Sequence, residues 1–135
     1  MTTLRRISFV SLIAVLVAAC DDDPSDPNPE PAVDCSAEVT EVEAHIDVDD
    51  DAVVFDWSPR CRVALLGVEE GASDRWWIGD EEQNTIEPPV TYGVTPDGVP
   101  GEDPLPLEPG VVYELILWIA TDDGPYLATV AEFER

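Results

Sequence analysis

From Val42 onward the hydrophobic residues recur with a period of two, and this alternation limits the possible folds more than any other feature. Val42, Ala44, Ile46 and Val48 alternate with polar residues until the acidic run 49–51 interrupts them. Such alternation is typical of a strand with one buried face. Further apolar runs are found at 53–57, 62–68, 76–78, 89–94, 111–120 and 126–133, the last two joined at a hairpin turn, Asp122-Asp123-Gly124. About seven short strands separated by Pro and Gly predict an all-β sandwich over residues 35–135.

Two motifs within this pattern narrow the fold class. The segment Leu107-Glu108-Pro109-Gly110-Val111-Val112-Tyr113 resembles the corner before the sixth strand of fibronectin type III domains. In that family the tyrosine hydroxyl bonds back to the loop backbone. The segment 55–59, Phe-Asp-Trp-Ser-Pro, resembles the family's second strand, whose tryptophan lies in the core. The resemblance implies a single immunoglobulin-like sandwich of fibronectin type III topology, although the long loop 95–106 and the cysteines are not typical of the family.

The resemblance also implies a role for two of the three cysteines. In such a sandwich the first strand leaves one pole, the second returns to it and the third starts there. Cys35 precedes the first strand and Cys61 precedes the third, so both belong at the same pole. In an exported protein this predicts a disulfide, which would stabilise the domain by about 3–4 kcal/mol. Two cysteines and a distant His45 do not make a zinc site.

The N-terminal residues have the order of a bacterial lipoprotein signal. Arg5 and Arg6 precede an apolar stretch at 7–17, which suits a signal peptide and is too short for a membrane span of about 20 residues. Residues 17–20, Val-Ala-Ala-Cys, resemble the lipobox of that class, in which cleavage before the cysteine leaves its sulfur to carry a diacylglycerol. The resemblance implies a signal peptide over 1–19 and a stable lipid anchor on Cys20. An ordinary secretory signal with an incidental cysteine is the alternative.

Residues 20–34 differ in composition from the rest of the mature chain. Prolines and acidic residues leave this segment almost nothing to bury, so we expect a disordered spacer that holds the domain away from the bilayer. The aspartates after Cys20 also resemble lipoprotein sorting signals. In some bacteria such residues retain the protein in the inner membrane, and in others they send it to the cell surface. The sequence therefore predicts the cell envelope without choosing the membrane.

The charge balance excludes one class of partner. The chain has 30 acidic residues against six arginines, no lysine and a formal net charge of −24. Nucleic acid binding depends on neutralising phosphates with Lys and Arg, so no nucleic acid partner is expected. Anionic lipid would also repel the domain, which leaves the lipid on Cys20 to hold it at the membrane. Solubility is a sufficient explanation of the charge itself.

The sequence offers no catalytic residues, no cofactor and no metal ligands. The only histidine, His45, alternates with apolar residues and should face solvent, and no G-x-S-x-G motif occurs. We therefore predict a non-enzymatic protein. Residues 47–51 match the D-x-D-x-D start of an EF-hand loop, but Ala52 and Ser58 stand where a glycine and a glutamate are needed. A weak calcium site of looser geometry is the alternative to a solvated acidic turn.

Alternation along 111–120 predicts an exposed face. If Tyr113 points inward, Ile116 and Trp118 point outward. Trp76 and Trp77 are adjacent on another strand, so one of them must point outward too. A contiguous patch of this kind marks an interaction site, where Trp and Arg are enriched. The alternative is that loop Thr95–Pro106 covers the face. The candidate binding face comprises Trp118, Ile116, Trp76 or Trp77 and Arg62, with Leu66 beside them.

These observations predict a membrane-anchored envelope lipoprotein whose sandwich binds a protein or mediates adhesion. A carbohydrate-binding module, with a tryptophan stacked on a sugar ring, is one alternative. An accessory domain of an envelope enzyme system is another. A flat array of aromatic rings would favour a glycan, whereas a mixed aliphatic and aromatic patch with Arg62 would favour a protein.

Overall fold

The computed structural model describes residues 33–36 and 41–135, and these fold into strands, turns and loops. The strands in chain order are β1 (Val33–Asp34), β2 (Glu43–Val48), β3 (Val53–Ser58), β4 (Cys61–Arg62), β5 (Leu65–Glu70), β6 (Ser73–Gly79), β7 (Val90–Thr91), β8 (Val112–Thr121) and β9 (Gly124–Glu134). The described residues contain no helix with the length and apolar character of a membrane span. The predicted signal peptide, Cys20 and the predicted linker up to residue 32 lie outside the described residues.

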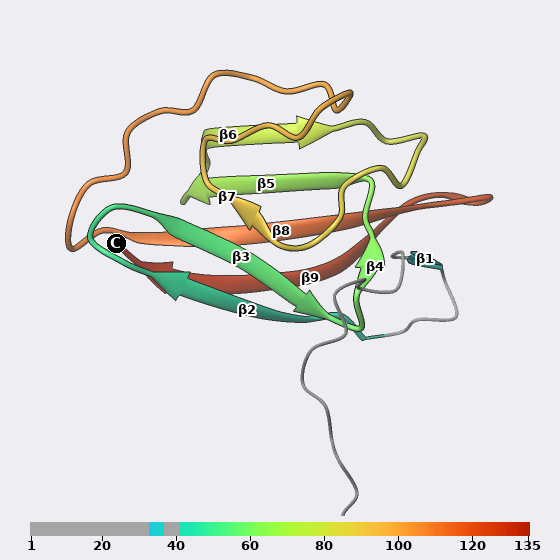
Figure 1. Ribbon diagram of the computed structural model, residues 1–135, viewed down its shortest axis with the longest axis horizontal. Helices are drawn as coiled ribbons and strands as arrows, with labels where there is room; N and C mark the ends of the chain where they lie inside the picture. Colours follow the sequence, from blue (N-terminus) through green and yellow to red (C-terminus); the bar gives the residue numbers. More distant parts are fainter. Residues whose placement is uncertain (1–32, 37–40) are drawn as a thin grey trace, which may run out of the picture. The chain divides into compact units, whose positions relative to one another are not determined.

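The strands form two layers (Figure 1). One sheet has the order β2-β3-β7 and lies in front of the other, whose order is β6-β5-β8-β9. All neighbours within these two sheets pair antiparallel. The turn at Asp122-Asp123 joins β8 to β9 as a hairpin, as the sequence predicted. The predicted all-β sandwich is thus confirmed.

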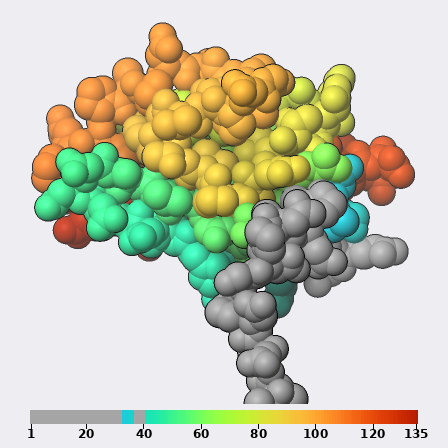
Figure 2. All heavy atoms as spheres, in the orientation of Figure 1, coloured from blue at the N-terminus to red at the C-terminus, as the bar shows by residue number. Residues whose placement is uncertain are grey.

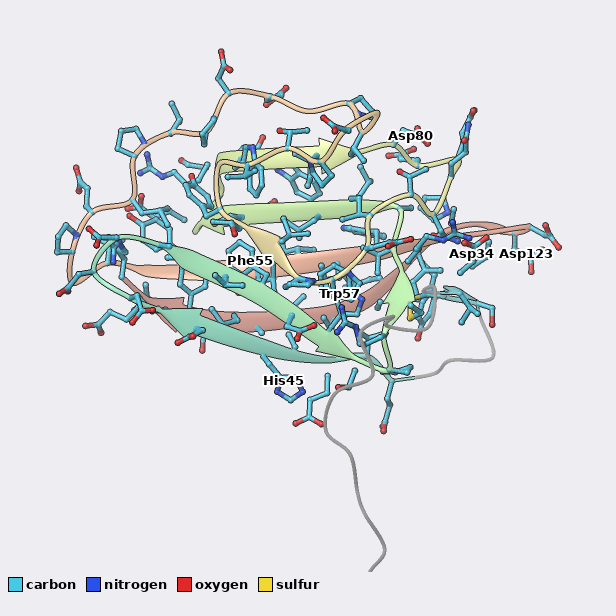
Figure 3. The ribbon with its side chains drawn as sticks, in the orientation of Figure 1. Asp34, His45, Phe55, Trp57, Asp80 and Asp123 are labelled. Carbon is cyan, nitrogen blue, oxygen red and sulfur yellow. A yellow bond between two sulfur atoms is a disulfide. The ribbon has the colours of Figure 1, made fainter. Side chains whose placement is uncertain are left out.

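The core lies between the two sheets and follows the predicted alternation. Along β3 the side chains of Phe55 and Trp57 are fully buried (Figure 3), and along β8 every second residue from Tyr113 to Ile119 is buried. The Tyr113 hydroxyl accepts a hydrogen bond of 2.8 Å from the backbone N–H of Glu108, so the corner bond expected from the resemblance is present. The core also contains Val53 of β3 and Leu115, Leu117 and Ile119 of β8. The other strands contribute Leu66, Val68, Trp76, Ile78, Val90 and Phe133.

The predicted disulfide between Cys35 and Cys61 is present, with Cα atoms 4.9 Å apart. It sets the chain before Cys35 beside β4, and β1 therefore pairs parallel with β4. The sequence had assigned Val33 and Asp34 to the linker. They belong to this short pairing because the disulfide holds their backbone within reach of Cys61 and Arg62.

The long loop 95–106 runs along the free edge of β6. Backbone hydrogen bonds join Gly79 to Pro100, Glu102 to Trp77 and Leu105 to Arg75, at 2.7–3.0 Å. In Figure 2, which shows the side of the three-stranded sheet, residues coloured yellow to orange fill the region in front of β5 and β6. The loop therefore closes the sandwich at this edge, where an open strand would otherwise invite pairing with another chain.

Candidate functional site

The outward side of the four-stranded sheet carries a continuous apolar surface, which we call the tryptophan face. Its residues come from cross-strand partners. Trp118 of β8 stands opposite Leu65 of β5 and Leu127 of β9. In the next row, Ile116 stands opposite Gly67 on one side and Val130 on the other, and Gly67 pairs with Trp77 of β6. The tryptophan face thus consists of Leu65, Trp77, Ile116, Trp118, Leu127 and Val130.

A glycine fixes the position of Trp77. A Cβ built at Gly67 would lie 2.5 Å from two carbons of the Trp77 indole, so only glycine leaves room for the ring to lie flat on β5. The indole N–H donates a hydrogen bond of 3.1 Å to the carboxylate of Asp74. The ring is therefore held by contacts on both sides and presents its remaining surface outward, beside Ile116.

A groove of about 480 Å³ opens at one end of the tryptophan face. Leu65, Trp77 and Trp118 form its apolar floor, and Asp80 and Glu81 stand at its margin. Both tryptophans are only partly buried. Two aromatic rings and a leucine around an open hollow are the surroundings in which an apolar side chain of a partner is well desolvated.

The loop 95–106 does not cover this surface. No residue of the loop lines the groove among the described residues, and its hydrogen bonds reach the edge of β6 and the inner side chains. The backbone carbonyl of Glu102 accepts from the Trp76 indole at 3.0 Å, and that of Leu105 accepts from the Tyr92 hydroxyl at 2.6 Å. The sequence had left open the alternative that this loop covers the face, and that alternative is wrong.

Three residues of the candidate face lie elsewhere. Trp76 is buried between the sheets with 1% of its surface exposed, because Trp77 takes the outward position. Leu66 is likewise fully buried, and Leu65 takes its place on the outer side of β5. Arg62 belongs to β4 and forms a salt bridge with Asp34 at a polar hollow near the disulfide. Pairing of β4 with β1 carries Arg62 away from the four-stranded sheet.

Four acidic residues extend the tryptophan face along the strands. Glu69 stands opposite both Asp74 and Glu114, and Glu114 stands opposite Glu132, so one carboxylate comes from each strand. We call this set the carboxylate row. Partial burial, followed by the charges of Asp74 and Glu114, raises the pKa of Glu69 above its ordinary value. The carboxylates of Asp74 and Glu114 are thus close enough to Glu69 to repel its charge.

The outer side of the other sheet carries His45. Its Nε2 lies 3.4 Å from the Ser58 hydroxyl, and Asp56 is its cross-strand neighbour. These are the residue types of a catalytic triad, but both His45 and Ser58 are exposed and their separation exceeds the reach of about 2.6–3.2 Å that a general base needs. The geometry therefore gives no support to nucleophilic catalysis here.

The acidic turn after β2 is held by an arginine. The Arg135 guanidinium donates hydrogen bonds to the backbone carbonyls of Asp49 and Asp50. Within residues 33–36 and 41–135, no three His, Cys, Asp or Glu residues gather as metal ligands would.

The sequence identified Trp118 and Ile116, because both lie on one regular strand. It missed Leu65, Leu127 and Val130, whose positions depend on register between strands. In β9 a bulge between the partners of Leu117 and Trp118 shifts the alternation, so Leu127 and Val130 share a face although they are three positions apart. The missed signal was the charge pattern. Glu114 and Glu132 each lie two residues from an outward apolar residue of the same strand, Ile116 and Val130, and Glu69 lies four residues from Leu65.

Comparisons of this chain with protein-family models, with curated proteins and with solved structures found no match.

Proposed function

We propose that this chain is a non-enzymatic bacterial envelope lipoprotein that binds a protein partner through the tryptophan face. In this proposal the signal peptide 1–19 is removed, lipid on Cys20 anchors the protein, and the acidic linker 20–34 holds the sandwich away from the membrane. No catalytic step and no cofactor are part of the proposal.

The observation that carries it is the composition of the tryptophan face. Six apolar residues from four adjacent strands form one contiguous surface around a groove. Contiguous apolar patches of this kind mark interaction sites, and tryptophans in partly enclosed surroundings supply most of the binding energy at such sites.

The same composition favours a protein over a glycan. The two tryptophans are accompanied by Leu65, Ile116, Leu127 and Val130, so the surface is a mixture of aliphatic and aromatic side chains. A sugar-binding surface would need rings spaced to stack on successive sugars. Arg62, which would also have favoured a protein, lies outside the face, so the argument depends on the aliphatic residues.

We also propose that the sandwich has fibronectin type III topology. Support comes from the sheets of three and four strands and from the Tyr113 corner, in which the hydroxyl bonds to the backbone a few residues upstream. The buried Trp57 of β3 fits the second-strand motif of the family.

Site-directed photocrosslinking in the native host tests the binding face. A photoreactive phenylalanine analogue at Leu127 or Val130 should form discrete adducts with a protein, because both side chains are more than 40% exposed on the face. The same analogue at Glu43 or Asp47, which are exposed on the other sheet, is the matched control. Glycan adducts, or equal protein adducts from both sheets, would contradict the proposal.

Two variants then connect the adducts to the tryptophans. Trp118→Ala should reduce the Leu127 adduct strongly, since truncating a hot-spot tryptophan costs about 2 kcal/mol or more of binding energy. Gly67→Ala keeps every aromatic residue but displaces Trp77 from its position, and it should have a similar effect. Unchanged adducts in both variants would remove the tryptophans from the binding site.

The anchor is tested separately. Cys20→Ser should leave an uncleaved precursor without lipid, because the signal peptidase of this class requires the cysteine. Normal cleavage of this variant and its release into the soluble fraction would show that the N-terminus is an ordinary secretory signal.

A further inference from the structure

We propose that the partner of the tryptophan face is a cationic polypeptide segment, whose apolar side chains contact the tryptophans while its Lys or Arg side chains lie over the carboxylate row. This inference rests on the proposed function and adds the chemical class of the partner. Its basis is the position of the carboxylate row next to the apolar surface, together with the charges of the rest of the chain.

The carboxylate row is unfavourable for the isolated domain. Like charges directly opposite each other on neighbouring strands destabilise a sheet, and the row places Asp74, Glu69, Glu114 and Glu132 side by side across all four strands. After partial burial, the charges of Asp74 and Glu114 contribute to the raised pKa of Glu69, as this repulsion requires. A cation placed over the row would relieve this repulsion. A cationic partner would therefore gain more binding free energy here than on a surface whose acidic residues lie apart from one another.

Each arginine of the described domain has a partner other than the row. Arg75 forms its salt bridge with Glu70, and Arg62 forms one with Asp34. Arg60 donates to the backbone carbonyl of Pro88, while Arg135 donates to the acidic turn after β2. These four are the only basic residues after position 20 apart from His45.

The small number of basic residues also excludes two other molecules or segments that could bind to the tryptophan face. A second copy of the domain has no free cation to offer and carries a large negative charge, so two copies meeting face to face would bring their carboxylate rows together. The chain's own linker 20–34 is acidic and contains no Lys or Arg. The cation must therefore come from a different molecule.

The geometry also predicts the pattern of the segment. Trp118, Ile116 and Glu114 follow one another at alternate positions of β8, and each step of two residues along a strand covers about 7 Å. An extended segment parallel to the strands would present side chains at the same spacing. It needs apolar residues at two alternate positions, followed by Lys or Arg at the next, over Glu114. A second Lys or Arg two residues further on would lie near Glu134, the cross-strand partner of Val112.

The four tryptophans provide a measurement with an internal control. Trp77 and Trp118 lie on the face, whereas Trp57 and Trp76 are buried. Labelling with 5-fluorotryptophan gives one ¹⁹F NMR signal for each, and single Trp→Phe variants assign them. The purified protein would be studied in phosphatidylcholine nanodiscs, with empty nanodiscs as the blank.

The probes are two synthetic peptides of seven residues. The first has leucine at positions one and three, lysine at five and seven, and threonine between them. The second has glutamine in place of lysine. We expect the lysine peptide to shift the signals of Trp77 and Trp118 alone and to bind at least about tenfold more tightly than the glutamine peptide at low salt. Its affinity should fall as salt is added.

A charge-matched pair of variants separates the row from the general acidity of the protein. Glu114→Gln with Glu132→Gln should weaken the lysine peptide about tenfold and leave the glutamine peptide unchanged. Glu43→Gln with Asp47→Asn removes two acidic residues from the other sheet and should change neither peptide. Equal weakening by the two pairs would show only long-range attraction and would overturn the proposal.

The outcomes also distinguish the two proposals. If both peptides bind at Trp77 and Trp118 with equal affinity, the proposal of a binding face is kept and the proposal of a cationic partner is wrong. If neither peptide shifts these signals while the photocrosslinks at Leu127 persist, the cationic class is again wrong. Loss of both the shifts and the crosslinks would overturn the proposed function itself.

Discussion

Tryptophan truncations on the two sides of the sandwich give the most direct test of which indoles are buried and which face outward. Trp57 is fully buried, and its indole N–H donates a hydrogen bond of 2.7 Å to the backbone carbonyl of Cys61. Replacing a core tryptophan with alanine costs about 3–5 kcal/mol of unfolding free energy. Part of this, about 1 kcal/mol, comes from leaving the Cys61 oxygen without its donor. We therefore expect Trp57→Ala to remove a large part of the stability of a domain of this size.

Trp118→Ala should cost much less. Its side chain is only partly buried, and its main neighbours on the sheet are Leu65 and Leu127. Each such cross-strand pair contributes about 0.2–1 kcal/mol, so the expected loss is about 0.5–2 kcal/mol. The losses of unfolding free energy in the two variants should thus differ by about 1–4.5 kcal/mol, and the loss should be larger at the buried position.

Urea unfolding followed by far-ultraviolet circular dichroism measures this difference without relying on tryptophan fluorescence. With a slope of about 2 kcal/mol per molar urea, Trp57→Ala should lower the midpoint by about 2 M and Trp118→Ala by less than about 1 M. If Trp57→Ala does not fold, the milder replacements Trp57→Phe and Trp118→Phe, which keep most of the ring volume, are compared instead. Equal midpoint shifts for the two positions would refute the assignment of Trp118 to an open face.

Three further measurements test the supporting contacts. Alkylation of the unreduced protein should modify neither Cys35 nor Cys61, and replacing both with serine should lower the unfolding free energy by about 3–4 kcal/mol; alkylation of both without a reductant would contradict the disulfide. Burial raises the pKa of Tyr92 from 10.0 to about 12, so its contribution to stability is complete below pH 10 and is lost as the pH rises through 12. Tyr92→Phe should lack this alkaline loss, and a variant with the same pH profile as the parent would count against the burial of this hydroxyl. Tyr113→Phe removes the acceptor of the corner hydrogen bond and should cost about 1–2 kcal/mol, whereas Tyr126→Phe, at an exposed position, should change nothing measurable.

The parts of this fold that the sequence predicted are those governed by local alternation. On β8, one inward residue, Tyr113, fixes the direction of every other side chain up to Ala120. The hairpin turn at Asp122-Asp123 is similarly local. The disulfide required more, namely a topology that brings two strand ends to one pole, and the family resemblance supplied it.

The errors all involve relations between strands. Alternation alone could not tell which of Trp76 and Trp77 points outward, because the choice depends on the register of β6 against β5 and on the space above Gly67. Arg62 was placed on the sheet because the run 62–68 looked continuous, whereas the chain leaves β4 at residue 62 and begins β5 only at Leu65. A single sequence contains no direct record of register, and these residues were therefore misplaced.

Register also explains why the carboxylate row appears only in three dimensions. Glu69, Glu114 and Glu132 are far apart in the sequence, where each is one acid among 30. Solubility alone requires charge somewhere on the surface, and it would be served as well by acids scattered over both sheets. Alignment across four strands adds repulsion that solubility does not need, and it occurs next to the apolar rows that contain Trp77 and Trp118. The repulsion among these carboxylates is best explained by the proposed partner, whose positive charge would offset it. In that proposal the carboxylates and the tryptophans act as one binding surface.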